Sequence, residues 1–268
     1  MTKFDNSPVP DFLARLRLDG KAFVVAGAGV GMGRMTCHAL AQAGARSIVC
    51  VDIDEERARS VAEEIGDAGV AWSGNVTTRD DAHRLAIDSE QLCGRIDGIV
   101  DIIGMAKWES ILDMSDQTFD WEIDMCLRHA FLLSQEFGRV MSTTGGGTMV
   151  FIASVSGLTA APMHAAYGAA KAALMAWVQS LAIELGPASI RANAISPGTI
   201  LSPRMDAIFN DEQRQANSSN TPLGRMGSTS EIASTALFLS SDLSSFITGR
   251  TIVVDGGVDA KFPYPTTL

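Results

Sequence analysis

The stretch Ala22-Phe-Val-Val-Ala-Gly-Ala-Gly-Val-Gly-Met-Gly33 decides the fold of this chain. Its first five residues are apolar and suit a buried strand, and the glycines lead into a segment of helical period at 31–44. Glycines at such a turn let the backbone approach a pyrophosphate, whose charge is met by the free N–H groups and dipole of the helix N-terminus. The stretch therefore predicts the first βα unit of an α/β protein, with an anion-binding turn.

The spacing of these glycines allows two interpretations. The G-x-G-x-x-G fingerprint fails, because Gly27 and Gly29 would need a third glycine where Met32 stands. The spacing G-x-x-x-G-x-G does fit, through Gly27, Gly31 and Gly33. A tight turn without a ligand would contain the same residues, so the loop alone favours dinucleotide binding without establishing it.

Short apolar runs alternate with longer segments of helical period along the rest of the chain. The strand candidates lie at 22–26, 47–52, 70–73, 98–103, 148–153, 190–195 and 251–254. The helix candidates lie near 31–44, 55–66, 78–92, 117–142, 165–186 and 229–240. This alternation predicts a Rossmann-like, doubly wound parallel sheet of about seven strands, built from right-handed βαβ units with helices on both faces.

The 268 residues suit one domain behind a short arm. Residues 1–20 carry two prolines and mixed charges, so we expect an N-terminal arm there and a single domain over 21–268. Residues 202–227 interrupt the alternation with a polar segment, and long insertions after strands often serve as lids. We expect a substrate lid at 202–227, followed by a helix that begins at the capping-box sequence Ser228-Thr-Ser-Glu231.

Composition excludes several classes of function. The formal net charge is −10 and no basic cluster is present, so we expect neither a nucleic-acid nor a membrane partner. The four cysteines are far apart and lack histidines at ligand spacing, which favours buried free thiols. Without a cationic leader or an apolar run of about 18 residues, a cytoplasmic location is expected.

An acid ends the second predicted strand. Asp52 follows Gly33 by 19 residues, where a carboxylate can accept hydrogen bonds from ribose hydroxyls and repel a 2′-phosphate. The next residue is Ile53, and no Arg or Lys lies between Gly27 and Gly33, so NAD is favoured over NADP. The simpler alternative is a solvated strand end or a helix cap.

A serine, a tyrosine and a lysine form the candidate reactive set. Tyr167 and Lys171 are four residues apart in a predicted helix and share a face, and Ser154 follows a predicted strand. A free tyrosine has a pKa of about 10. A neighbouring cation favours the phenolate, which can exchange a proton with a substrate oxygen. An Ala-rich helix can carry this spacing by chance, so the other motifs decide between the two interpretations.

Taken in order, the motifs resemble those of the short-chain dehydrogenase/reductase family from about Gly20 to Gly257. The resemblance rests on the glycine loop, the strand-end acid, the serine–tyrosine–lysine set, and two later stretches, Asn193-Ala-Ile-Ser-Pro-Gly198 and Ile247–Gly257. It implies hydride transfer between a substrate carbinol carbon and C4 of a nicotinamide cofactor, here NAD, with no metal.

The resemblance also implies residue roles. Tyr167 would be the general acid/base, Ser154 would orient the reacting oxygen, and Lys171 would lower the pKa of Tyr167 and bind the nicotinamide ribose. The backbone of Ile200 would meet the carboxamide, and Ser202 the carboxamide or pyrophosphate. The implied cofactor-binding residues are Gly27, Gly31, Met32, Gly33, Asp52, Asn75, Val76, Gly104, Tyr167, Lys171, Pro197, Gly198, Ile200 and Ser202.

Residues in loops after strand ends and in the predicted lid are the candidates for substrate contact. They suggest an apolar, cyclic or bulky substrate, although ordinary packing explains each one singly. His164 could line the mouth of the substrate site, but we interpret it as a surface or helix-start residue. The candidates are Met105, Trp108, Ser156, Met163, Met205 and Phe209.

The chain departs from the family pattern at several positions. Asp101 and Cys126 each stand where the family usually has Asn, the second being a catalytic Asn that supports a proton relay behind the lysine. A thiol is only a weak donor, so the relay needs backbone and water or another path. Asp101 needs donors or a raised pKa if it is buried. Ala26 and Asn75 replace the usual Thr and Asp.

The sequence therefore predicts an NAD-dependent oxidoreductase that interconverts a secondary alcohol and a ketone. By resemblance we expect a homodimer or homotetramer. Two alternatives stay open: an NADP-linked ketone reductase, and a cofactor-binding protein without catalysis. The stretch Ile102-Ile103 and Cys126 suggest the latter, but a decayed site would be expected to lose Tyr167, Lys171 or Ser154 first.

Overall fold

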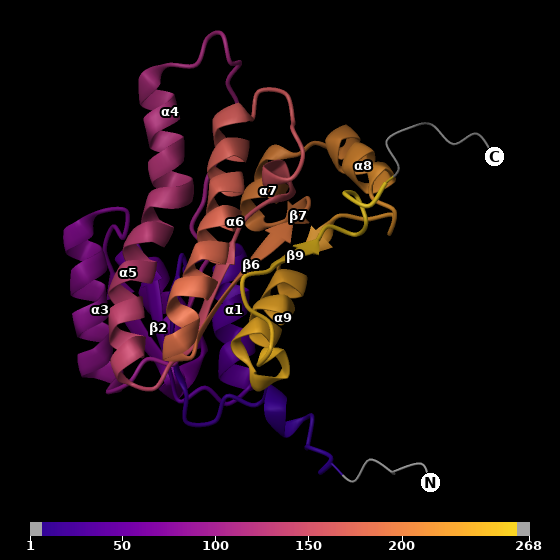
Figure 1. Cartoon of the computed structure of the whole chain (residues 1–268). Helices are drawn as coiled ribbons and strands as arrows, with labels where there is room; N and C mark the ends of the chain where they lie inside the picture. Colours follow the sequence, from indigo (N-terminus) through magenta and orange to yellow (C-terminus); the bar gives the residue numbers. More distant parts are fainter. Residues whose placement is uncertain (1–6, 262–268) are drawn as a thin grey trace, which may run out of the picture.

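The computed structural model describes residues 7–261 and shows a parallel seven-stranded sheet between two layers of helices (Figure 1). The strands run in the order β3-β2-β1-β4-β5-β6-β9. They are β1 (Ala22–Ala26), β2 (Ser47–Asp52), β3 (Gly69–Ser73), β4 (Gly98–Asp101), β5 (Gly147–Ile152), β6 (Ile190–Pro197) and β9 (Thr251–Val254). The predicted fold class is confirmed.

The strand order reverses between β1 and β4, and this point positions the site. From β1 the chain winds outward to β2 and β3, and from β4 it winds the other way to β9. In doubly wound sheets, ligands bind outside the carboxyl ends of the strands at such a switch point. The loops that follow β1 and β4 therefore form the expected crevice.

Each face of the sheet carries its own layer of helices. One face is covered by α1 (Gly31–Gln42), α2 (Glu55–Glu64) and α9 (Thr229–Ser240). The other is covered by α3 (Arg79–Cys93), α5 (His129–Thr143) and α6 (Ala165–Leu185), and α4 (Asp116–Ile123) packs against α6. Short 3-10 turns lie at Ala14–Leu16, Gly66–Ala68, Val155–Gly157, Gly186–Ala188 and Asp242–Ser244.

The apolar runs of the central strands fill two cores at once. Along β1, Val24 packs into the core under α3, α5 and α6, whereas Phe23 and Val25 pack into the core under α1 and α9. Successive side chains of a strand point to opposite faces, so a strand buried on both faces must be apolar throughout. Full burial of one such side chain contributes about 1.5–3 kcal/mol.

The predicted single helix over 117–142 is wrong in one respect. The structure has α4, then a π-helical turn at Asp124–Arg128, then α5. An interruption of this kind often marks a functional site. Hydrophobic periodicity cannot locate it, because the two helices continue each other across the turn.

The segment 202–227 is an insertion with its own helices. It contains α7 (Pro203–Ile208) and α8 (Asp211–Asn220), and its ends are joined by pairing of β7 (Ile200–Leu201) with β8 (Gly227–Ser228). The capping box of Ser228 and Glu231 begins α9 as predicted. Among the described residues, no helix is both long and apolar enough to cross a membrane.

The end of the expected arm is held against the domain. Leu18 is fully buried, and Asp19 pairs with Ala45 in an isolated bridge. Residues 1–6 of the arm lie outside the described part of the chain.

Candidate active site

The glycine loop forms a cradle at the N-terminus of α1. Gly27 and Gly31 have φ values of 83° and 61°, which favour glycine, and a Cβ on Gly33 would collide with the carbonyl oxygen of Gly27. The N-cap Val30 offers no side chain to the first N–H groups of the helix. These groups are therefore free to bind an anion, and the cradle fits the pyrophosphate of a dinucleotide.

Asp52 is oriented by the loop that it faces. Its Oδ2 accepts from the backbone N–H of Gly29 at 3.0 Å, and its Oδ1 accepts from the N–H of Asp54 at 3.0 Å. Arg57, which no sequence motif indicates, also lies beside the loop: its Cβ is 2.7 Å from where a Cβ on Gly29 would lie. The Nε of Arg57 is 3.4 Å from Asp54 Oδ2, so this cation is already paired.

The serine, tyrosine and lysine meet at the carboxyl end of β5. Lys171 is buried and donates from Nζ to the carbonyl of Ile152 at 2.7 Å. Its Nζ lies 5.8 Å from the ring centre of Tyr167 on the same helix. The side chain of Ser154, just past the strand, is hydrogen-bonded to Tyr167. The structure thus brings the three predicted residues together.

The electrostatics of Tyr167 differ from the expectation. Burial raises its pKa to about 12, and nearby Cys126 adds to the rise, while the hydrogen bond from Ser154 opposes it. Burial also lowers the pKa of Lys171. Without a bound ligand, the chain therefore holds the phenol protonated, and the predicted lowering by Lys171 does not prevail over the loss of solvent.

Two rings stack beside the reactive phenol. His164 lies 4.5 Å from Tyr167 and 4.1 Å from Trp108 between ring centres, with interplanar angles of 18° and 4°. The Nδ1 of His164 is 3.3 Å from Ser156 Oγ. His164 does precede the helix, but its ring is half-buried in the stack, and burial lowers its pKa, so it is neutral at pH 7.

A buried histidine is the partner of Asp101. Nδ1 of His129, in the first turn of α5, lies 2.6 Å from Asp101 Oδ2, and the backbone N–H of Ile103 donates to Oδ1 at 3.1 Å. The sequence did not single out His129. Its position on the inward face of a predicted helix, opposite a strand-end acid, was the available signal.

The other predicted cofactor residues differ in which of their groups can still bind a ligand. Ser202 Cβ is 3.7 Å from where a Cβ on Gly31 would lie, so the segment after β6 packs on the glycine loop. Asn75 Oδ1 already accepts from Thr77. The side chain of Val76 is buried in the core, so only its backbone can meet a ligand.

The remaining glycines of the predicted set lie where other residues come close to the backbone. A Cβ on Gly104 would be 2.9 Å from Lys171 Nζ, and one on Gly198, which follows Pro197 at the end of β6, would be 2.7 Å from Asp255 Cβ. Met32 packs against the core under α1, and Ile200 is buried in β7. A larger side chain at Gly104 would therefore crowd the lysine, and one at Gly198 would crowd Asp255.

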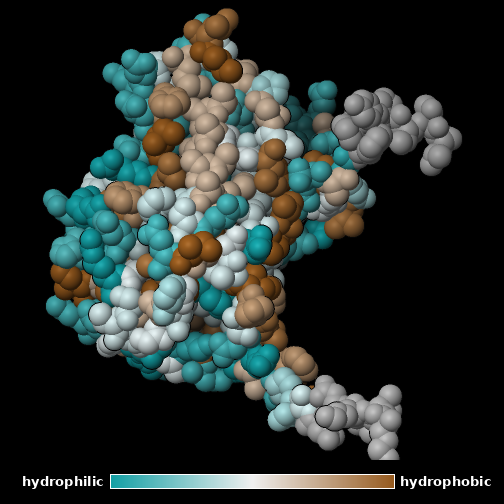
Figure 2. All heavy atoms as spheres, in the orientation of Figure 1, coloured by the Kyte–Doolittle hydropathy of each residue, from teal (hydrophilic) through white to brown (hydrophobic). Residues whose placement is uncertain are grey.

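The predicted substrate residues lie around the carboxyl edge of the sheet. Met105, Trp108 and Met163 are 40%, 59% and 51% exposed, and Met205 and Phe209 are half-buried in and after α7. The neighbouring Arg204 favours the Tyr167 phenolate, so this end of the lid acts on the site. Figure 2 shows hydrophobic spheres at the top of the molecule, over the loop before α4.

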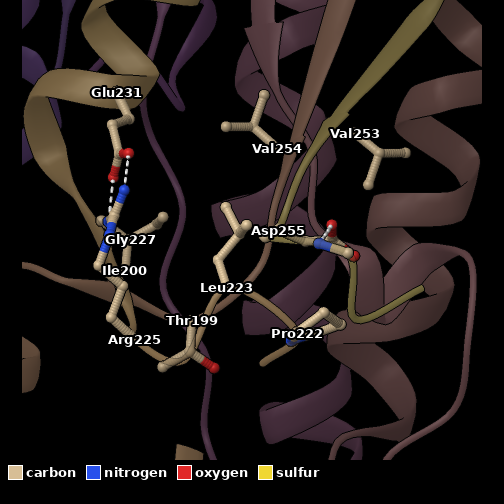
Figure 3. Close-up of a pocket in the computed structure, with 12 residues that line it drawn as sticks. Thr199, Ile200, Pro222, Leu223, Arg225, Gly227, Glu231, Val253, Val254 and Asp255 are labelled. Carbon is tan, nitrogen blue, oxygen red and sulfur yellow. Dashed lines mark hydrogen bonds and ion pairs between the residues drawn. The ribbon is translucent and has the colours of Figure 1, made fainter. Parts of the chain in front are cut away.

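A second hollow lies away from the reactive groups. Figure 3 shows this pocket of about 460 Å³, and Ser154, Tyr167 and Lys171 do not line it. Leu223 and Val254 are among its apolar lining, and the ion pair of Arg225 and Glu231 closes one side. It touches the expected cofactor site only through Ile200.

Comparisons with known proteins agree with this geometry. The profile of the family described as "Enoyl-(Acyl carrier protein) reductase" matches residues 27–259. The NAD-dependent glycerol dehydrogenase of Listeria innocua is 33% identical, over 90% of this chain and 94% of that protein. L-rhamnose 1-dehydrogenase (NAD(P)(+)) of Azotobacter vinelandii is 34% identical, over 89% and 96%.

A solved structure gives the same result. The 7α-hydroxysteroid dehydrogenase complexed with NADH and 7-oxoglycochenodeoxycholic acid superposes with a TM-score of 0.88 at 32% identity, covering 91% of this chain and 96% of that chain. The chain belongs to the short-chain dehydrogenase/reductase family, a class of oxidoreductases.

Proposed function

We propose that this protein is an NAD-dependent dehydrogenase that interconverts a secondary alcohol and its ketone. The observation that carries the proposal is the meeting of Ser154, Tyr167 and Lys171 at the end of β5, beside the glycine cradle at the switch point. Dehydrogenases acting on glycerol, L-rhamnose and a steroid are among its relatives, which supports oxidation at a CH–OH group.

Each residue of the set has a distinct part in this reaction. In the oxidation, Tyr167 takes the proton of the substrate hydroxyl, and Ser154 holds the same oxygen by a hydrogen bond. The ammonium of Lys171 stabilises the phenolate electrostatically. A bound oxidised nicotinamide would supply the hydride acceptor.

The preference for NAD rests on Asp52. Its carboxylate is fixed toward the glycine loop by the Gly29 N–H, where it would accept from ribose hydroxyls and repel a 2′-phosphate. The alternative, an NADP-linked ketone reductase, is favoured by the nearness of Arg57, which would have to leave Asp54. Competition of NAD⁺ against NADP⁺ in a binding titration decides between them.

The substrate site favours a molecule with an apolar ring or bulky face. Trp108 presents an exposed ring on the outside of the aromatic stack. Met105 is exposed in the same loop, and Met163 is exposed next to His164. We propose that Met205 and Phe209 of the lid, and Ser156 after β5, also contact the substrate. The lid at 202–227 would close this space over the substrate.

The direct test is protein-dependent formation of NADH, followed by absorbance, over a panel of cyclic, aromatic and polyhydroxy alcohols. We expect oxidation of at least one cyclic secondary alcohol. If the protein binds NADH but oxidises none of the panel, the dehydrogenase proposal fails. The result would then favour the alternative of a cofactor-binding protein without catalysis.

We further propose that the chain acts as a homodimer or homotetramer in the cytoplasm. Along α6, Ala172, Ala173 and Ala176 are exposed, and Ile183 is 80% exposed, so a face of small and apolar residues is open to a partner helix. The groove between α5 and α6 holds the half-buried Trp177.

A further inference from the structure

An acid is buried behind the lysine of the site. Glu122, in the last turn of α4, is 1% exposed, although its helix lies beside a loop that is largely open to solvent. Removing a carboxylate from water is costly unless partners compensate it. The reaction described above gives this residue no part, so its burial needs an explanation.

The partners of Glu122 come from the loop after β4 and from the π turn. Oε1 accepts from the backbone N–H of Lys107 at 2.5 Å. Oε2 lies 3.8 Å from the Sγ of Cys126, one turn further along, and that Sγ is also 3.2 Å from the carbonyl oxygen of Met105. The thiol is therefore in contact with the acid and with the loop.

The same loop holds the lysine on its other side. Lys171 Nζ is 3.5 Å from the carbonyl oxygen of Ile103, and a Cβ on Gly104 would lie 2.9 Å from Nζ. Residues 103–107 thus contact Lys171 at one end and Glu122 at the other. Cys126 contacts the same segment between these two points, at the carbonyl oxygen of Met105.

Burial brings the pKa values of the acid and the lysine closer together. Burial raises the pKa of Glu122, and Lys107, Cys126 and Lys171 oppose the rise. Burial lowers the pKa of Lys171, and Cys126, Asp101 and Glu122 oppose the fall. Transfer of a proton from the ammonium to the carboxylate is therefore easier here than between the same groups in water.

We propose that Glu122 is the internal proton acceptor behind Lys171. The inference rests on the proposed function. In alcohol oxidation the proton taken by Tyr167 must leave before the next turnover. Lys171 gives one N–H proton to the Cys126 thiol, which passes its own proton on to form the O–H of Glu122. Lys171 then regains a proton from the O–H of Tyr167. Lysine and thiol end unchanged, the phenolate is restored, and Glu122 is neutral.

The acid then returns its proton to solvent. Lys107, whose backbone holds Oε1, is exposed, as are Gly104 and Met105 of the same loop. Water at this loop takes the proton from Glu122, and the carboxylate is ready for the next cycle. Glu122 acts through Lys171 and does not touch the substrate, so it is a positioning and relay residue.

The test compares Glu122→Gln with the wild type and with Asp120→Asn. Gln keeps the shape and the acceptor for Lys107 but cannot take up a proton, and Asp120 is an exposed acid on the same helix. We expect kcat for oxidation to fall at least about tenfold in Glu122→Gln, and to rise again with the concentration of a small buffer. Asp120→Asn and the wild type should show no buffer dependence.

A measurement without cofactor separates the relay from the reaction itself. Infrared difference spectra of the ligand-free wild type should show the carbonyl stretch of a protonated buried acid, titrating above the usual range of glutamate and missing in Glu122→Gln. An active wild type with an unchanged, buffer-independent Glu122→Gln overturns the relay alone. A wild type that oxidises no alcohol overturns the proposed function as well.

Discussion

At the scale of the residue, burial and neighbouring groups shift the pKa values of the site residues in opposite directions. The pKa of Tyr167 is raised to about 12 by burial, although Ser154 and Arg204 favour its ionised form. The same burial that keeps the phenol protonated would exclude water around a bound substrate and strengthen each charge interaction there.

Replacing Tyr167 by Phe tests the acid/base role directly. Phe keeps the stack with His164 but removes the hydroxyl that exchanges the proton. We expect kcat to fall by a factor of about 10² to 10⁴ or more, with NADH affinity nearly unchanged in a fluorescence titration. Retention of most of the activity by a correctly folded variant would contradict the assignment.

Replacing Asp52 by Ala tests the choice of cofactor. The variant loses acceptors for the ribose hydroxyls, and we expect NAD⁺ to bind about tenfold or more weakly, since a hydrogen bond to a charged group contributes roughly 1.5–3 kcal/mol. NADP⁺ should bind more tightly than before. Glu63→Ala is the matched control, because it removes an exposed acid at the other end of α2. Equal effects of both variants would show that Asp52 does not discriminate.

At the scale of the element, helix ends and one helix interruption define the geometry. The uncapped start of α1 leaves donors for an anion, whereas α9 satisfies its own first turn with the capping box of Ser228 and Glu231. The π turn places Cys126 toward the loop after β4. The lid is tied to the domain at both ends by the β7–β8 pairing.

The start of α9 makes stability depend on pH. The pKa of Glu231 is lowered to about 2, first by the hydrogen bond from Arg225 and then by the N–H of Ser228. A lowered folded-state pKa contributes stability that is present above the unfolded value of 4.5 and is lost as the pH falls toward 2. The side chain is 38% exposed, so solvent screening reduces the effect.

We therefore expect Glu231→Gln to lower the thermal midpoint at pH 7 by about 2–4 °C, for a loss of roughly 1 kcal/mol. The difference from wild type should shrink as the pH drops below 4.5. Glu212→Gln, on the exposed side of α8, is the control and should have little effect. A deficit that stays constant with pH in thermal scans would rule out the ion pair and the cap as its source.

At the scale of the whole molecule, the sequence predicts the architecture well because the pattern is repeated in every unit. Each strand buried on both faces is an apolar run, and each covering helix has its own period, so the sheet and its layers follow. The triad also follows, since Ser154, Tyr167 and Lys171 lie at fixed places in those elements.

What the sequence did not predict depends on contacts between distant segments. His129 meets Asp101 only because α5 packs on β4, and Glu122 meets Lys107 only because the loop after β4 comes back against α4. Arg57 approaches Gly29 through the packing of α2 on the end of β2. Periodicity carries no information on such pairings, and the net pKa of Tyr167 depends on how deeply it is buried.

The proposed assembly is also a property of the whole molecule. Placing a charge on the exposed face of α6, with Ala173→Arg, should break a helix-to-helix interface and shift the sedimentation coefficient to that of a smaller species. Ser60→Arg, on the exposed side of α2, is the matched control. If both variants sediment as the wild type does, α6 is not the interface.

The stack of Trp108, His164 and Tyr167 has a practical consequence for experiments. The chain has four tryptophans, and Trp108 is the one that this ring stack joins to the reactive tyrosine, while its outer face is 59% exposed. A molecule that settles against this indole would alter its emission. Fluorescence quenching can therefore rank ligands of the site before any turnover is known, with Trp108→Phe as the blank.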